Sequence, residues 1–131
     1  LVGMGFSGDA RQGMPFRDWL VAGAKKEEFT DALSECCVIV VCRNSVWQFS
    51  NGPDPLPVRN TAAIGSGSDF ATSALSLGKT APEAVVHAIK HDTFSGGPVL
   101  CLSFNESGEP LLSHYKDQEH ISLEANVSLA W

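Results

Sequence analysis

The sequence predicts an α+β domain in which two helices stand between antiparallel hairpins. Residues 36–50 and 98–113 each read as an apolar strand, a turn and a returning strand. Between these hairpins, residues 67–93 combine helical spacing of apolar residues with a helix-start signal. Because the helices are grouped and do not alternate regularly with the strands, we expect antiparallel layers, with two sheets between helical layers as one option.

Composition limits the domain count and the class of function. The 131 residues suffice for one domain but not for two. We therefore expect a single domain over residues 1–131, with a core at 1–113 and a tail or edge strand at 114–131. The net charge is −6 and no basic stripe occurs, so a nucleic-acid partner is not expected. The longest apolar run, residues 36–42, is too short to cross a bilayer, so no membrane role is expected either.

The cysteines and histidines give no clear metal motif. Four cysteines, at positions 36, 37, 42 and 101, lie in apolar runs without a CxxC pair. This favours reduced core thiols in a cytoplasmic protein and predicts neither a metal nor another cofactor. His87 and His91 are four residues apart, but Ala88 stands where a zinc-protease helix needs a glutamate. We interpret them as solvated residues of one helix face, with metal binding as the minor alternative.

The first third of the chain predicts a strand, a helix and a connector. Residues 1–6 read as a glycine-thinned strand, and residues 7–9 as a turn in which Asp9 caps the next helix. That helix spans residues 10–24 and is disturbed or restarted at Gly13-Met14-Pro15. We place five residues on its apolar side: Met14, Phe16, Trp19, Leu20 and Ala24. Residues 25–35 form a charged connector with room for a short helix.

Residues 36–57 predict a hairpin and a loop. The run at 36–42 is β-branched and apolar at successive positions, which is typical of a central strand covered on both faces. A turn at 43–45 leads into an alternating partner strand at 46–49, and the proline-rich residues 51–57 form a rigid surface loop.

Two glycine-serine turns border the predicted helices. Residues 61–64 read as a short buried strand that turns at Gly65 and Gly67 into a helix containing residues 70–75. Thr80 and Glu83 form a capping box at the start of the second helix. Asp92 lies at its far end, where the helix dipole disfavours a carboxylate by roughly 0.3–1 kcal/mol. Such a carboxylate needs a partner, so the small residues of the turn suggest a backbone-lined site.

The remaining strands follow this turn. Residues 98–104 form a strand, residues 105–109 a turn, and residues 110–113 the returning strand. The tail alternates weakly and is either an edge strand or an arm on a neighbour.

Taken singly, the serines and the aspartate have ordinary interpretations. Ser66 and Ser68 are suitable helix caps, and Asp92 is a polar helix end. No G-x-S-x-G elbow surrounds any serine of these turns, and Gly65-Ser66-Gly67 lacks the further residues of a dinucleotide fingerprint or a P-loop.

The combination of turns resembles the second half of a proteasome β-subunit and the related bacterial protease HslV. The similarity rests on Ile64-Gly65-Ser66-Gly67-Ser68, the two helices, and His91-Asp92-Thr93-Phe94-Ser95-Gly96-Gly97 before a strand. It covers roughly residues 1–113. It implies the four-layer αββα sandwich of antiparallel sheets that characterises these N-terminal nucleophile (Ntn) hydrolases.

The resemblance also implies roles for individual residues. Ser66 matches the serine beside the catalytic threonine, and Asp92 and Ser95 match the residues that orient and hydrogen-bond the amine of the nucleophile. Val2 to Asp9 matches the strand and turn that supply the oxyanion hole, with Gly8 as the N–H donor and Ser7 as its helper.

The sequence departs from the family in two ways. The long second helix of the family is reduced to about residues 25–35, as in the compact proteasome-like proteins of some bacteriophages and bacteria. The nucleophilic threonine, with its supporting aspartate and lysine, would precede Leu1, which carries neither hydroxyl nor thiol. We therefore expect a fragment or processed product that lacks the first strand pair.

These features lead to two functional hypotheses. The first is a proteasome-like threonine-type peptidase domain, inactive as this chain alone, that acts on peptide or protein substrates once its N-terminal segment is present. The second is a non-catalytic protein that keeps the fold for assembly or for binding a host factor. In either case we expect a homo-oligomer or association with a separate N-terminal segment, because the missing strands would leave sheet edges open.

Overall fold

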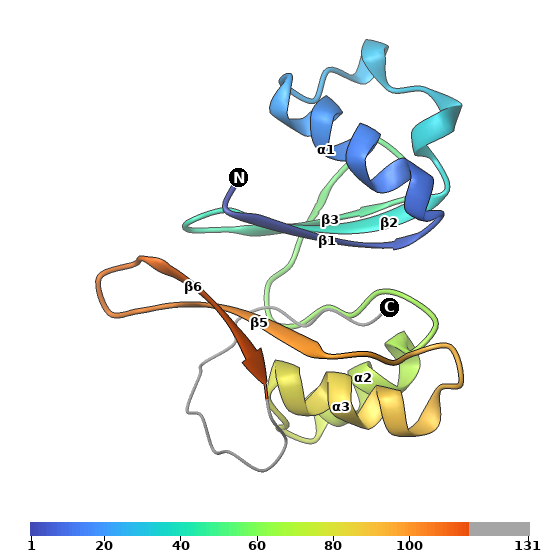
Figure 1. Cartoon of the computed structure of the whole chain (residues 1–131). Helices are drawn as coiled ribbons and strands as arrows, with labels where there is room; N and C mark the ends of the chain where they lie inside the picture. The colour runs from blue at the N-terminus through green and yellow to red at the C-terminus, as the bar shows by residue number, and fades with distance from the viewer. Residues whose placement is uncertain (116–131) are drawn as a thin grey trace. The chain divides into compact units, whose positions relative to one another are not determined.

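The computed structural model describes residues 1–115, which fall into two compact units. The first comprises residues 1–59 and the second begins at Asn60 (Figure 1). Each unit contains one antiparallel sheet and its own helices. The α+β class predicted from the sequence is therefore present in both.

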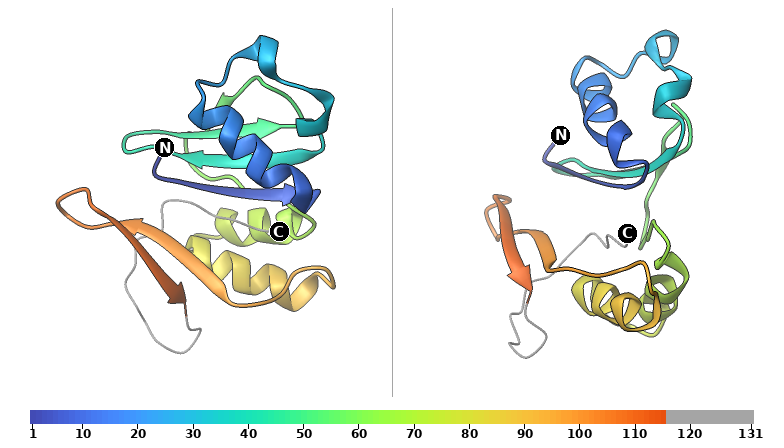
Figure 2. Two further views of the ribbon diagram at one scale, coloured as in Figure 1. Left: turned by 45° about the horizontal axis from the view of Figure 1, so that its top comes forward. Right: turned by 45° about the vertical axis from the view of Figure 1, so that its right-hand side comes forward.

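The first unit is a four-stranded antiparallel sheet with α1 against one face (Figures 1 and 2). The strand order is β1-β2-β3-β4. Its regular elements are β1 (Gly3–Gly8), α1 (Gly13–Val21), β2 (Cys36–Val41), β3 (Val46–Ser50) and β4 (Leu56–Pro57). Three 3₁₀ turns, η1 (Ala10–Gln12), η2 (Lys26–Glu28) and η3 (Asp31–Leu33), complete it.

The predicted central strand is confirmed. β2 pairs with β1 on one side and with β3 on the other, and Val38 and Ile39 are both fully buried although their side chains point to opposite faces. This burial on both faces explains why the strand reads as a continuous apolar run rather than an alternating one.

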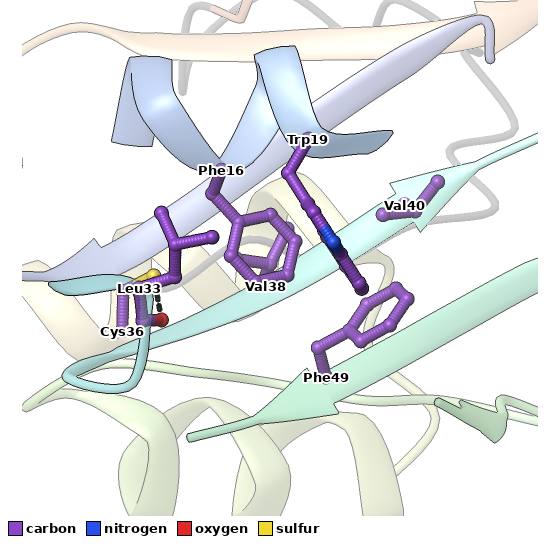
Figure 3. Packing of buried hydrophobic residues seen from close by; sticks show 7 residues of the cluster. All are labelled: Phe16, Trp19, Leu33, Cys36, Val38, Val40 and Phe49. Atoms are coloured by element: carbon purple, nitrogen blue, oxygen red, sulfur yellow. Dashed lines mark hydrogen bonds between the residues drawn. The ribbon is translucent and has the colours of Figure 1, made fainter. Parts of the chain in front are cut away.

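An aromatic cluster joins α1 to the sheet (Figure 3). Phe16 has no exposed surface and makes edge-on contacts with Trp19 and Phe49, with ring centroids 5.3 Å apart in both pairs. The indole of Trp19 also donates a 2.9 Å hydrogen bond to the carbonyl of Lys25, which satisfies its polar atom. The cluster thereby fixes both the helix and the start of the connector after it.

Three expectations for the first unit are corrected by the structure. The helix begins at Gly13, after a separate 3₁₀ turn, and Met14 is 53% exposed. Two residues span about 200° around a helix, so Met14 and Phe16 lie on opposite faces. Ser7 and Gly8 belong to β1 and not to a turn, because they pair with Cys37 and Cys36.

The third correction concerns the proline-rich loop. Its last two residues form β4, which pairs with Trp47 and Gln48 of β3. The charged connector contains only 3₁₀ turns, in agreement with a segment too short for a stable α-helix.

The second unit contains two packed helices and a two-stranded sheet. The helices are α2 (Ser68–Ser76) and α3 (Ala81–His91), and the antiparallel strands are β5 (Val99–Phe104) and β6 (Pro110–Tyr115). Figure 1 shows α2 and α3 side by side, and α3 also contacts β5. Both hairpins and both helices predicted from the sequence are thus confirmed.

Alanines form the interface between α2 and α3. Ala71 and Ala74 of α2 pack with Ala84 and Ala88 of α3, and all four are buried. Because these side chains end at Cβ, the two helix backbones approach closely. This close approach brings the turn before α2 next to the turn after α3.

Residues 61–64 are not a strand. Only Ile64 is buried, and no sheet pairing includes these residues within the part of the chain that the structure describes. An apolar run of this length does not by itself supply a hydrogen-bonding partner. The predicted tail lies outside the described residues from 116 onward, and residues 114 and 115 belong to β6.

Two further findings bear on the sequence-based expectations. All four cysteines are free thiols, and burial raises the pKa of Cys36 and Cys101. Among residues 1–115, no helix has both the length and the apolar character needed to cross a membrane.

Candidate functional site

The structure brings Ser66, Asp92 and Ser95 together in the second unit. The Ser66 hydroxyl and the Ser95 hydroxyl each donate a 2.6 Å hydrogen bond to the same carboxylate oxygen, Oδ2 of Asp92. Ser66 precedes α2 by two residues, whereas Asp92 is the C-cap of α3 and Ser95 follows three residues later. Segments 26 residues apart in the sequence therefore converge on one oxygen atom.

Gly67 makes this convergence sterically possible. A Cβ at residue 67 would lie 2.8 Å from Ser95 Oγ and 3.0 Å from Ala88 Cβ. The contact with Ser95 Oγ is shorter than proteins normally show and the contact with Ala88 Cβ is tight, so a larger residue would force the Ser95 side chain or the backbone around it to shift. The glycine is required here for close approach and not for its backbone angles, because its φ is −89°.

The serine hydroxyls lower the pKa of Asp92. The hydrogen bond from Ser66 has the largest effect, that from Ser95 is second, and a bond from the backbone N–H of Phe94 adds to both. All three stabilise the charged form, and together they outweigh desolvation, which acts in the opposite direction. Asp92 is therefore a carboxylate at neutral pH.

The hydrogen bonds from Ser66, Ser95 and the Phe94 N–H provide the partners that a carboxylate at the C-terminal end of α3 requires. The helix dipole disfavours a negative charge at a C-terminus. The backbone N–H of Asp92 still bonds to the carbonyl of Ala88, so the residue closes the helix normally while its side chain bonds to the two serines. A carboxylate has about four acceptor positions, so it retains capacity for a further donor such as an amine.

The predicted oxyanion residues, Ser7 and Gly8, lie in the first unit at the end of β1. Gly8 has φ +113°, and a Cβ there would lie 2.4 Å from the Glu35 carbonyl oxygen. This backbone conformation and this contact both demand glycine. The proposed oxyanion role of the two residues remains a prediction.

Sequence reasoning missed two contributors to the site. The sequence predicts Gly67 only as part of a sharp turn, and its motifs do not indicate a role for the N–H of Phe94. The Asp92-Thr93-Phe94 spacing does signal the bond from the Phe94 N–H, because aspartates often bond to the backbone N–H two residues on.

A separate surface pocket of about 240 Å³ lies between α2 and α3. It is lined by residues including Ala74, Glu83 and His87, and by none of the three site residues.

Comparison with known proteins gives one informative result. No protein-family model and no curated protein matches the chain. Among solved structures, the chain is similar to the eukaryotic HslV from Trypanosoma brucei, with a TM-score of 0.52 and 18% sequence identity. The match covers 85% of this chain and 74% of the HslV chain. At this identity the likeness establishes the fold alone, which is an α+β fold similar to that of the HslV chain.

Proposed function

We propose that this chain is the main part of a threonine-type peptidase of the proteasome kind. The observation that carries the proposal is the pair of 2.6 Å bonds from Ser66 and Ser95 to Asp92. The similarity of fold to HslV supports it independently. The finer architecture that we propose is a four-layer αββα sandwich, in which the sheets of both units belong to one domain.

The proposed chemistry uses an N-terminal threonine as nucleophile. Its hydroxyl attacks the peptide carbonyl, and its own α-amine accepts the proton. Asp92 holds a negative charge and accepts bonds from fixed donors, so it is suited to bind and orient that amine. Ser66 and Ser95 hold the carboxylate in place, and backbone N–H groups stabilise the oxyanion.

The proposed mechanism requires a threonine with a free α-amine. We propose that this threonine and the first strand pair of the fold belong to a segment N-terminal to these 131 residues. The 131-residue chain alone should then be inactive, and a form extended by such a segment should be active.

Peptide hydrolysis tests the proposal directly. We expect no turnover of fluorogenic peptides by the 131-residue chain, and turnover sensitive to a threonine-directed inhibitor when an extension starting with threonine is processed to expose it. In the extended form, Asp92→Asn should lower the rate by about 10²–10⁴-fold, the usual scale for lost acid–base support. Asp69→Asn is the matched control, because this exposed carboxylate lies in the first turn of α2.

Three results would contradict this function. Inhibitor-sensitive turnover by the 131-residue chain would place the nucleophile inside it. Full activity of Asp92→Asn in the extended form would remove Asp92 from the site. A correctly processed extended form that folds and assembles but cleaves no peptide would favour the non-catalytic alternative.

A further inference from the structure

His87 and His91 form a close pair on the surface of α3. Their ring centroids are 4.5 Å apart with the planes tilted by 54°. Residues four positions apart lie on the same face of a helix, one turn from each other. The helix therefore places the two side chains next to each other on one face.

A third aromatic ring restricts the pair. Phe70 of α2 stacks on His91, with centroids 5.5 Å apart and planes 24° from parallel. The stack covers one face of the imidazole and limits its rotation, while the ring nitrogens lie at the edge. A ring that is already restricted loses less conformational entropy when it binds a ligand.

The separation of the rings fits two neighbouring ligands of one metal ion. An imidazole nitrogen binds a metal at about 2.0–2.1 Å, which places the ring centroid about 3.2 Å from the ion. Two such rings at a right angle about the ion then have centroids about 4.5 Å apart. Right-angled ligands are typical of the tetragonal geometry of Cu²⁺ and Ni²⁺.

The helix dipole at this end of α3 also favours a cation. Both histidines are in the second half of α3, which ends at His91. The C-terminal end of a helix carries partial negative charge and favours a cation. No cluster of three or more metal-binding side chains occurs among residues 1–115, so water would complete the coordination.

We propose that His87 and His91 form a two-histidine site for a divalent transition-metal ion of the Cu²⁺ and Ni²⁺ type. The site shares no residue with the Ser66–Asp92–Ser95 network and does not depend on the proposed peptidase function. Metal binding would link the last turn of α3 to the turn before it, and so would stabilise the second unit.

Calorimetric titration of the full chain with Ni²⁺ alone tests the site. We expect binding of one ion through this pair, and a loss of affinity of about tenfold or more in His87→Gln and in His91→Gln, because the second imidazole acts at a high effective concentration. Glutamine keeps the size and polarity of the side chain, so α3 should fold in both variants. His114→Gln, which alters an exposed histidine of β6, should bind with unchanged affinity.

Thermal unfolding followed by circular dichroism gives a second measurement. Ni²⁺ should raise the unfolding temperature of the natural chain and of His114→Gln, but raise it less in the two α3 variants, because a ligand of the folded state stabilises that state. Absence of Ni²⁺ binding by the natural chain would overturn the proposal. Equal affinity in the natural chain and His87→Gln, or an equal loss in His114→Gln, would also overturn it.

Discussion

At the scale of single residues, the site depends on one carboxylate held by short-range contacts. Asp92 accepts both serine hydroxyls at one oxygen, and the contacts draw on two turns that only the packing of α2 on α3 brings together. The residue could be identified from the sequence as a charge that needed a partner. Its partners could be named only through resemblance, because spacing alone suits Ser66 equally well as a helix cap.

The pKa of Asp92 should rise when a serine donor is removed. Ser66→Ala should raise it most, because the Ser66 bond is the largest cause of the lowered value, and Ser95→Ala should raise it less. Carboxyl-carbon NMR titration measures this directly, with Ser68→Ala as the control. Equal titration curves in the natural chain and in Ser66→Ala would contradict the hydrogen-bond network.

The lowered pKa of Asp92 also predicts that the stability of the folded chain depends on pH. The pKa of Asp92 is lower in the folded state than its ordinary value of 3.8. Its stabilising contribution is therefore complete above that ordinary value and is lost as the pH falls through the folded value. Acid unfolding of the natural chain should show this loss, and Asp92→Asn should remove that part of the dependence.

Gly67 offers a second test at the residue scale. Gly67→Ala should lower the free energy of unfolding by about 1–3 kcal/mol, the usual cost of overpacking, because its Cβ would meet Ser95 Oγ at 2.8 Å. It should also raise the pKa of Asp92 if Ser95 moves away. Gly96→Ala is the matched control, since no atom lies within 4 Å of its added Cβ. Urea unfolding should separate the two variants, and equal losses in both would show that the turns are not closely packed.

At the scale of elements, the structure confirms the predicted helix-start signal of α3. Thr80 accepts a hydrogen bond from the Glu83 N–H at 3.4 Å, and the Glu83 side chain accepts one from the Thr80 N–H at 3.0 Å. These bonds join residues three apart, so they are local and do not depend on the rest of the chain. α3 then carries both Asp92 and the histidine pair at its far end.

Removing the cap should destabilise α3 and the turn that it positions. Thr80→Ala should lower the free energy of unfolding by about 0.5–2 kcal/mol. Thr72→Ala, an exposed threonine within α2, is the control and should change it by less than about 0.5 kcal/mol. Urea unfolding monitored by far-ultraviolet circular dichroism compares the two, and an equal effect would contradict a specific capping role.

At the scale of the whole molecule, the second sheet is the least self-sufficient part. Within residues 1–115 it consists of β5 and β6 alone, so its stability depends on packing against α3, which contacts β5. Leu112 of β6 is 71% exposed. Edges of this kind are normally covered in natural proteins, which supports the expectation that the chain associates with itself or with a separate N-terminal segment.

Light scattering after size exclusion should therefore show a species heavier than the 14.0 kDa chain. Leu112→Glu should increase the monomer fraction, because a charge on an edge strand opposes pairing. Leu77→Glu is the control, since Leu77 is also largely exposed, at 78%, but lies at the end of α2. A natural chain that remains monomeric at high concentration would contradict this prediction.

The sequence by itself determined the features that depend on neighbouring residues. Continuous β-branched residues identified β2, the capping box identified the start of α3, and the two hairpins followed from strand and turn residues. Tertiary structure decided the features that depend on distant partners. Residues 61–64 have strand-like composition but no sheet pairing within the described part of the chain, whereas Leu56 and Pro57, in a proline-rich loop, pair with β3. Ser66 likewise became a partner of Asp92 only because buried alanines let α2 and α3 approach closely, and local sequence does not encode such a contact.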